Sequence, residues 1–190
     1  GMRKGGLDIA DEGKDKNSFC GRHGILVDFL ECWSGKGSDI YETVQRAFNI
    51  CDLYGYHLVD YDADGLGAGA RGDARIINTN RKNDGKNKIP FNPFRGSGEI
   101  VDPKGNPWQG SDEGKDGEKG RTNLDFFQNA KAQGWWSLRT RFRNTYRAVV
   151  EGLSFNRDDI ISISSAIPEY QKLVTELSQP TYSQNNTGKI

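Results

Sequence analysis

The 190-residue sequence lacks an apolar run long enough to cross a bilayer, and no signal peptide stands at its start. Apolar residues make up only 34% of it, whereas glycine occurs 24 times, so much of the chain is expected to form loops. It has no excess charge of either sign, because 26 Lys and Arg residues balance 26 Asp and Glu residues. We expect a soluble, intracellular protein without a membrane partner, in which any nucleic-acid surface comes from local segregation of charge.

Cysteine is also scarce. Cys20, Cys32 and Cys51 are odd in number and lack CxxC spacing, which argues against a disulfide framework or a zinc site. We expect three small buried thiols in a reducing compartment. Gly1 and Met2 resemble a cloning remnant, and we expect the sequence to be part of a longer protein.

The most informative stretch is residues 56–72, YHLVDYDADGLGAGARG. Its first half alternates and is rich in aromatic and β-branched residues, which is typical of a buried strand. Three carboxylates follow, Asp60, Asp62 and Asp64, and then several glycines. Clustered carboxylates repel one another, so a bound cation would explain the arrangement. An ordinary exit from a strand into a loop has the same composition and remains an alternative.

The glycines of this stretch admit another interpretation. Gly67, Gly69 and Gly72 match GxGxxG, the dinucleotide-binding fingerprint. That fingerprint opens its helix straight from a strand, whereas here an acidic turn intervenes. A Rossmann site is therefore the less favoured alternative.

The first third of the sequence predicts strands and then a helix. Residues 7–10, 18–22 and 25–33 form three short apolar segments separated by polar turns, which predicts an antiparallel meander. Residues 38–55 predict a helix, because Asp39 can cap its start and Gly55 can end it. This helix leads directly into the strand that carries the three carboxylates.

Asp8 is unusual because it lies among the apolar residues of the first predicted strand. It has no obvious partner in the sequence. The interpretation that the residues alone offer is that Asp8 closes a turn with Lys14 or Lys16.

A long irregular region is expected between residues 73 and 123, which are dense in Gly, Asn, Lys and Asp. Only residues 76–77 and 89–94 resemble strands. Long loops inside a domain are usually functional or mobile. Residues 102–120 have almost no apolar content, so we expect them to be disordered.

Residues 124–152 predict a long helix that is interrupted near Gly134. Its apolar stripe is expected to consist of Leu138, Phe142, Tyr146 and Val149. After it we expect a short strand at residues 160–163, a helix between the prolines 168 and 180, and a polar tail over residues 181–190.

The same helix carries a run of arginines that includes Arg139, Arg143 and Arg147. Guanidinium groups bind phosphates in a bidentate manner, so these three are candidate DNA-binding residues. The alternative is a solvated helix face that is partly paired with Asp125 or Glu151.

Five segments together resemble the nuclease domain of the tailed-phage terminase large subunit, and they occur in the order of that family. They are LDIADEGKDKN, VDYDADGLGAG, IPFNPFRGSG, NAKAQGWWSLRTRF and DDIISISSAIPEYQKLVTELSQPTY. The resemblance implies an α/β, RNase H-like fold, with a mixed sheet flanked by helices. It implies one nuclease domain over residues 1–190, with residues 73–123 as a loop-rich insertion.

The resemblance also implies an activity, which is divalent-metal-dependent cleavage of double-stranded concatemeric DNA during packaging. Asp8 and Asp62 fall on the family's catalytic, metal-binding acids, which hold two Mg²⁺ or Mn²⁺ ions. Implied partners are double-stranded DNA, an ATPase domain of the same polypeptide, the portal protein and the small terminase subunit. The implied location is the host cytoplasm.

The sequence departs from the family pattern in two ways. The third acid of the family lies in a serine-proline-aspartate stretch near the C-terminus, and no such stretch occurs before Ile190. Asp158 and Asp159 are the nearest clustered acids, but we expect them not to substitute. The ATPase motif GxxxxGK[ST] is absent too. A non-catalytic module that docks DNA or the portal is therefore the alternative function.

Overall fold

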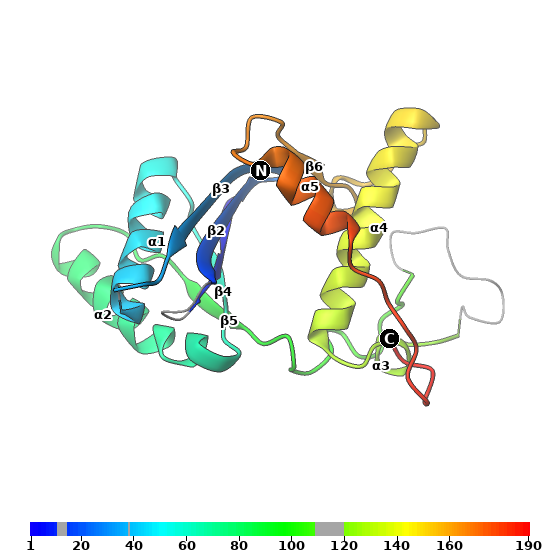
Figure 1. Cartoon of the computed structure of the whole chain (residues 1–190), viewed down its shortest axis with the longest axis horizontal. Coiled ribbons are helices and arrows are strands. Elements are labelled where there is room, and N and C mark those ends of the chain that lie inside the picture. Colours follow the sequence, from blue (N-terminus) through cyan, green and yellow to red (C-terminus); the bar gives the residue numbers. More distant parts are fainter. Residues whose placement is uncertain (11–14, 38, 109–119) are drawn as a thin grey trace. The chain divides into compact units, whose positions relative to one another are not determined.

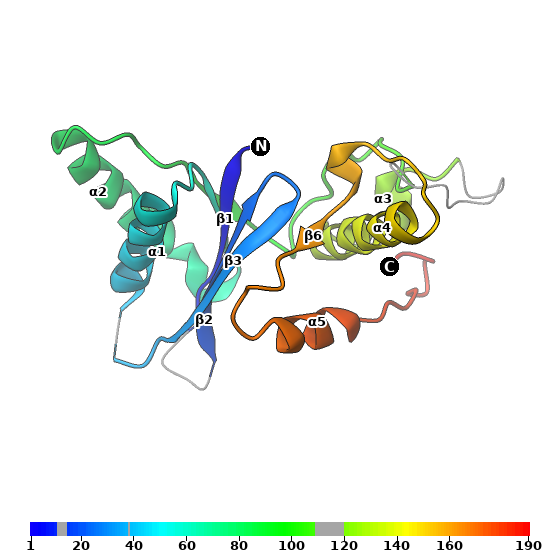
Figure 2. The same cartoon turned by 90° about the horizontal axis from the view of Figure 1, so that it is seen from above.

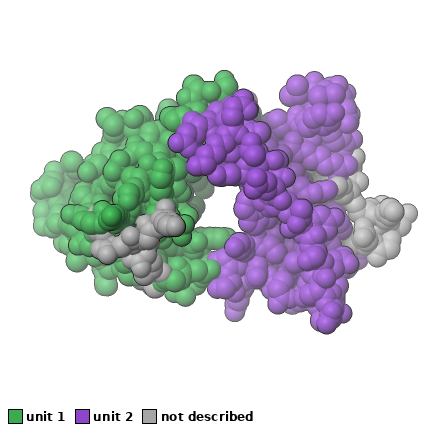
Figure 3. Space-filling view, viewed as in Figure 1, with its two compact units in different colours: residues 1–95, 163–168 green, residues 96–162, 169–190 purple. Residues whose placement is uncertain are grey.

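The computed structural model describes residues 1–10, 15–37, 39–108 and 120–190. They form two compact units, which Figure 3 shows in green and purple. Unit 1 comprises residues 1–95 and 163–168, and unit 2 comprises residues 96–162 and 169–190. That residues 1–190 act as one nuclease domain stays a prediction.

The described residues form a six-stranded sheet in the order β5-β4-β1-β2-β3-β6. Its strands are β1 (Arg3–Asp8), β2 (Lys16–His23), β3 (Leu26–Ser34), β4 (Val59–Asp62), β5 (Phe91–Phe94) and β6 (Ser162–Ile163). β2 is antiparallel to both β1 and β3, so the predicted meander is confirmed. β4 is parallel to β1, and β5 is parallel to β4. The sheet is therefore mixed, as the RNase H-like prediction requires.

The predicted helix at residues 38–55 is confirmed as α1 (Ile40–Tyr54). Its start is capped by Asp39, whose Oδ1 accepts a hydrogen bond from the Glu42 amide at 2.8 Å. Its end is set by Gly55, which has a φ of 72° in the left-handed region.

The core of unit 1 lies between one face of the sheet and two helices. Figures 1 and 2 show α1 and α2 (Ala70–Asn83) on the same side of the sheet. Phe19 and Val59 of the sheet and Phe48 of α1 are almost completely buried in this core. Burial of each such side chain contributes about 1.5–3 kcal/mol.

The prediction that residues 73–123 are irregular, with a strand at residues 76–77, is wrong at its start. α2 occupies Ala70–Asn83, and its buried side chains are Ala70, Ala74 and Ile77. These residues recur at the spacing of a helix face, which packs against α1 and the sheet. Tertiary packing of this stripe outweighs the low helix propensity of the Gly and Asn residues around it. The strand predicted at residues 89–94 is confirmed as β5.

The prediction of three buried thiols is wrong for two of them. Cys51 is buried on the inner face of α1, but Cys20 and Cys32 are exposed. Side chains alternate between faces along a strand, and in β2 it is Phe19 that points into the core. Cys20 therefore lies on the opposite face of the sheet.

The described residues of unit 2 form three α-helices and one 3-10 helix. They are α3 (Asn123–Phe126), α4 (Ala130–Val150), η2 (Arg157–Asp159) and α5 (Tyr170–Ser178). The predicted long helix is indeed interrupted, but not near Gly134. The break lies just before Asn129, whose Oδ1 accepts a hydrogen bond from the Ala132 amide at 3.0 Å and caps α4. α4 continues through Gly134, because a single glycine inside a helix costs only about 1 kcal/mol.

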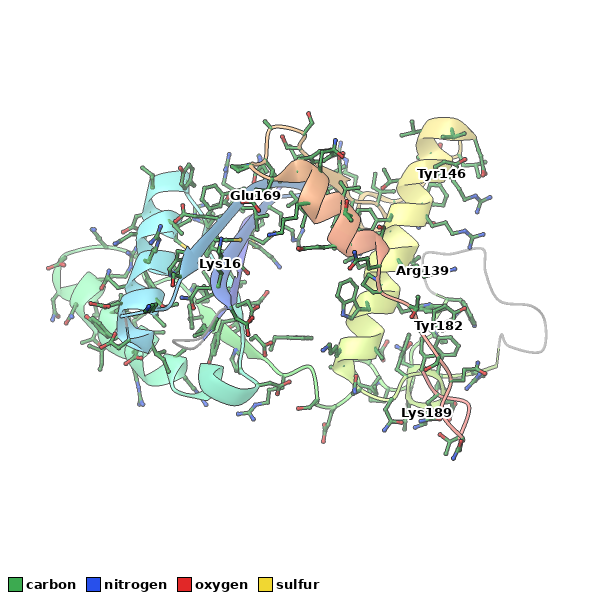
Figure 4. All side chains as sticks on the ribbon, viewed as in Figure 1. Lys16, Arg139, Tyr146, Glu169, Tyr182 and Lys189 are labelled. Atoms are coloured by element: carbon green, nitrogen blue, oxygen red, sulfur yellow. The ribbon has the colours of Figure 1, made fainter. Side chains whose placement is uncertain are left out.

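The predicted apolar stripe of α4 is wrong in its second half. Leu138 and Phe142 are half-buried, but Tyr146 and Val149 are exposed, and Tyr146 is labelled in Figure 4. The side chains that α4 buries include Trp136, Thr140 and Asn144 instead. Asn144 donates a hydrogen bond to the Asp159 carbonyl at 2.9 Å, so a polar residue is satisfied in the interior.

Aromatic residues form the core of unit 2. Trp108, Phe126 and Trp136 are buried together, with ring centroids 5.0 to 5.4 Å apart. Residues 102–120 were predicted to be disordered. Residues 109–119 of this segment lie outside the described part of the chain, so the prediction is not tested there. The described residues before them are folded, because Trp108 belongs to this core.

The polar tail at residues 181–190 packs on unit 2. The Ile190 amide donates to the Phe126 carbonyl at 2.9 Å, and the Gln128 amide donates to the Ile190 carbonyl at 2.6 Å. Among the residues described, no helix is both long and apolar enough to span a membrane.

Candidate active site

The two candidate acids lie at the carboxyl ends of neighbouring strands. β1 and β4 run parallel in a register that pairs Gly6 with Asp60 and Leu7 with Tyr61. Asp8 and Asp62 are the next residues along each strand. The structure therefore brings together two residues that are far apart in the sequence.

The alternation of side chains directs both acids to the same face of the sheet. Leu7 and Tyr61 are 3% and 1% exposed and point into the core. Asp8 and Asp62, which follow them, are exposed on the other face. Their carboxylates remain accessible to a ligand from outside.

The electrostatics of Asp8 show that the two acids interact. Partial burial raises the pKa of Asp8 above its usual value, and the nearby charge of Asp62 raises the pKa further. Asp15 adds a smaller effect in the same direction, while a hydrogen bond from the Ile9 backbone opposes them. A cation between the carboxylates would relieve this repulsion.

The turn after β4 orients Asp62. Its Oδ1 accepts a hydrogen bond from the Asp64 amide at 2.9 Å, which leaves the other carboxylate oxygen for a ligand. Gly65 has a φ of 61°, and a Cβ at Gly67 would overlap with the Asp62 carbonyl. Glycine at position 67 is therefore required by the close approach of the backbone.

The remaining acids of the DYDAD block lie differently. Asp60 is two residues back on β4, where its Oδ1 accepts a hydrogen bond from the Asn92 side chain at 3.2 Å. Asp64 is already in the turn. That Asp60 and Asp64 matter less than Asp62 stays a prediction.

The other interpretations of these residues can be compared with the structure. Lys14 lies outside the described residues, and in the part that the structure describes no ion pair joins Asp8 to Lys16. The GxGxxG match does not open a helix straight from a strand, because η1 (Gly65–Ala68) stands between β4 and α2.

Asp158 and Asp159 are both on η2 in unit 2, where they line a small polar cavity of about 290 Å³ together with Arg141 and Asn123. Among the residues that the structure describes, no three His, Cys, Asp or Glu side chains gather closely enough to hold a metal ion. The described site is thus a pair of carboxylates.

The candidate DNA-binding arginines lie on α4 in unit 2. The guanidinium of Arg139, labelled in Figure 4, lies over the Trp136 ring at 4.7 Å. Arg147 Nε donates to Glu151 at 2.8 Å, as the solvated-face alternative predicted. Arg143 is half-buried. Contact of the three with DNA stays a prediction.

One residue near the acids was missed by the sequence analysis. Asn17 of β2 is fully buried, and its Oδ1 accepts a hydrogen bond from the Ala10 amide at 2.9 Å. This bond holds the chain just beyond Asp8. The signal was a polar residue at an inward position of an alternating strand, since Asn17, Phe19 and Gly21 share a face.

A mixed sheet with helices on one face and an acid pair at the carboxyl ends of two parallel strands defines an RNase H-like domain. Among solved structures, the nuclease domain of the large terminase subunit gp2 of bacterial virus Sf6 is similar over the whole chain. The identity is 31%, the TM-score is 0.82, and the chain covers 76% of that domain.

Point mutants of the same Sf6 domain are similar to the chain as well. One was solved with manganese and beta-thujaplicinol and is 32% identical, with a TM-score of 0.82. Another was solved with calcium and is 31% identical, with a TM-score of 0.81. Each match covers 100% of this chain and 76% of the solved one. No protein-family model matches the chain, and no curated protein does.

The chain therefore belongs to the family of nuclease domains of phage large terminase subunits. The resemblance stated from its five sequence segments is confirmed, and so is the RNase H-like fold.

Proposed function

We propose that the chain is an endonuclease domain that hydrolyses phosphodiester bonds of double-stranded DNA at the Asp8–Asp62 pair, during the packaging of concatemeric phage DNA. The observation that carries the proposal is the position of the pair, at the carboxyl ends of the adjacent parallel strands β1 and β4. The similarity to a viral nuclease domain at 32% identity supports it.

The donor set of the pair fits a hard divalent cation. Carboxylate oxygens are the ligands that Mg²⁺ and Mn²⁺ prefer. Partial burial raises the pKa of Asp8 most, and the charge of Asp62 raises it further, so a cation bound at the pair would offset the repulsion between the two carboxylates. The Sf6 domains solved with manganese and with calcium support a divalent-metal cofactor here. Two bound ions would activate a water molecule and stabilise the leaving oxygen.

The residues of the chain supply a rigid arrangement of ligands. The ladder between β1 and β4 fixes the two acids relative to each other, and the Asp64 amide fixes the rotation of the Asp62 carboxylate. Ligands on strands are held more firmly than ligands on loops. The pair therefore needs little reorganisation when a cation binds.

The proposal also covers the partners and the location of the domain. As the family resemblance implies, its partners would be an ATPase domain of the same polypeptide, the portal protein and the small terminase subunit, and it would act in the host cytoplasm. Arg139, Arg143 and Arg147 remain candidates for contact with DNA.

A non-catalytic role is the second candidate. It is favoured by the absence of a third carboxylate beside Asp8 and Asp62 among the residues described. In that role the domain would dock DNA or the portal, and the acids would have no catalytic task.

Nicking of supercoiled plasmid separates the two candidates. The wild-type chain is incubated with Mn²⁺, with Mg²⁺ or with EDTA, and Asp62→Asn is compared with Asp84→Asn. Asp84 is an exposed acid at the end of α2, so its variant loses the same charge away from the pair. We expect metal-dependent nicking in the wild type and in Asp84→Asn, and none in Asp62→Asn. Nicking by Asp62→Asn at the wild-type rate and melting temperature would refute the assignment.

A further inference from the structure

Phe94 stands next to Asp62 at the same end of the sheet. β5 is the edge strand beside β4 and runs parallel to it, and the register pairs Asp60 with Asn92 and Asp62 with Phe94. Neighbouring strands lie about 4.8 Å apart, so the backbone of Phe94 is one strand spacing from that of Asp62.

The direction of the Phe94 side chain follows from its neighbours on β5. Phe91 points into the core, where its ring stacks on Tyr61 with the centroids 4.4 Å apart. Asn92 points to the opposite face, where its side chain donates a hydrogen bond to Asp60 at 3.2 Å. Because side chains alternate along a strand, Phe94 shares the face of Asn92. This is the face that carries the acid pair.

The backbone of Phe94 is held firmly at this position. Its carbonyl accepts a hydrogen bond from the Ala63 amide at 2.8 Å, and the Pro90 carbonyl accepts one from the Val59 amide at 2.9 Å. Both ends of β5 are thus joined to β4. Pro93 fixes its own φ as well, which an edge strand tolerates.

Phe94 offers apolar surface in a row of polar side chains. The ladder continues from Asp62 to Asp8 and then to Ser18, so Phe94 ends a row of three polar residues on this face. The Phe94 side chain is 45% exposed. A single exposed apolar residue is ordinary at a protein surface, but this one is fixed directly beside the candidate metal ligands.

The chemistry of DNA supplies an apolar partner at this distance. A phosphate held at the acid pair by a cation brings the attached deoxyribose next to it. In a duplex the faces of the bases are stacked on one another, whereas the C–H groups of the sugar are accessible beside the phosphate. An aromatic ring can bury these groups and exclude water from them.

We propose that Phe94 packs against the deoxyribose next to the scissile phosphate and thereby positions this phosphate at the Asp8–Asp62 pair. The inference rests on the proposed function, because it names a contact that seats the substrate at that site. It differs from the contact predicted for the arginines of α4, since an apolar contact releases no counterions and adds no salt dependence.

Cleavage kinetics test the inference. KM and kcat for a short DNA duplex are measured with Mn²⁺ over a series of salt concentrations, for Phe94→Ala, Phe94→Leu and Ile76→Ala. Ile76 is the control, because it is 53% exposed on α2, which covers the face of the sheet opposite to the acid pair. Thermal melts and Mn²⁺ calorimetry accompany the kinetics.

Phe94→Ala should raise KM about fivefold at every salt concentration, because the apolar contact of the ring is lost. Its kcat, Mn²⁺ affinity and salt slope should stay at the wild-type values, since such a contact is made equally in the ground state and the transition state. Phe94→Leu should keep KM within about twofold of wild type, because leucine retains most of the apolar surface. Ile76→Ala should leave KM unchanged.

Four results would overturn the inference and leave the proposed nuclease intact. They are a wild-type KM in Phe94→Ala, an equal rise in Ile76→Ala, a KM in Phe94→Leu as high as in Phe94→Ala, and a loss of Mn²⁺ affinity or melting temperature that accounts for the effect. The last would make Phe94 a structural residue. A wild-type chain that cleaves no DNA would instead refute the proposed function itself, and the inference with it.

Discussion

Gly67 shows how a residue without a side chain supports the candidate site. A Cβ there would overlap with the carbonyl of Asp62, so Gly67→Ala must displace the turn that orients this acid. We expect a loss of about 1–3 kcal/mol in stability, as for other overpacked positions, and weaker Mn²⁺ binding. Thermal melts and calorimetry measure the two effects.

Gly72 provides the matched control. It lies within α2, and a Cβ there would meet nothing within 4 Å. Gly72→Ala should stabilise the helix by about 0.5–1 kcal/mol. Equal melting temperatures for the two variants would contradict the role assigned to Gly67.

Single residues also mark the limit of inference from sequence. Asp62 was identified by its position at the end of a predicted strand, and Asp8 was assigned to the site by the family resemblance. The structure places the two side by side. Asn17 was not identified, because asparagine is usually found at surfaces and only the packing around β2 shows that this one is buried.

At the scale of elements, an ion pair joins α1 to α2. Asp52 of α1 accepts two hydrogen bonds from Arg81 of α2, at 2.7 and 2.8 Å. These bonds, and the charge of Arg81, lower the pKa of Asp52. A lowered carboxylate pKa contributes stability above the pKa of the unfolded state, and this contribution is lost as the pH falls through the folded pKa.

We therefore expect Asp52→Asn to cost about 0.5–1 kcal/mol at neutral pH, since the pair is partly exposed and screened by solvent. The difference from wild type should begin to shrink below about pH 4, the ordinary pKa of aspartate in the unfolded chain, and should vanish once the folded Asp52 is protonated as well. Urea unfolding at a series of pH values measures it. A difference that stays constant down to pH 2 would show that the charge of Asp52 is not responsible.

The buried face of α4 gives a second prediction at this scale. Asn144 is 1% exposed and bonds to the Asp159 carbonyl. Asn144→Ala should destabilise unit 2 by about 1–3 kcal/mol, because an interior hydrogen bond is lost and its partner is left unsatisfied. Tyr146→Ala and Val149→Ala are the controls and should change stability by less than about 0.5 kcal/mol. The opposite ranking in thermal melts would restore the apolar stripe predicted from the sequence.

At the scale of the whole molecule, the number of carboxylates limits metal binding. Two acids can hold one divalent ion, but two ions close together repel each other and need further negative ligands. We expect calorimetry to show one readily occupied site and a second only at high metal concentration. DNA cleavage should be slow and faster with Mn²⁺ than with Mg²⁺. Two equally tight Mg²⁺ sites would mean that a third acid is already present among the 190 residues.

The sequence by itself determined the features that depend on near neighbours. The meander, the capped helix α1 and the acidic turn after β4 were predicted correctly, because capping, alternation and turn formation are decided within a few residues. The family resemblance was carried by short segments of the same kind.

Only the tertiary structure decided which distant segments meet. It placed β4 beside β1, so that Asp8 and Asp62 became neighbours. It also made residues 70–83 helical and buried the polar face of α4. These outcomes depend on contacts between residues far apart in the chain, where packing outweighs local propensity. No local pattern contains that information.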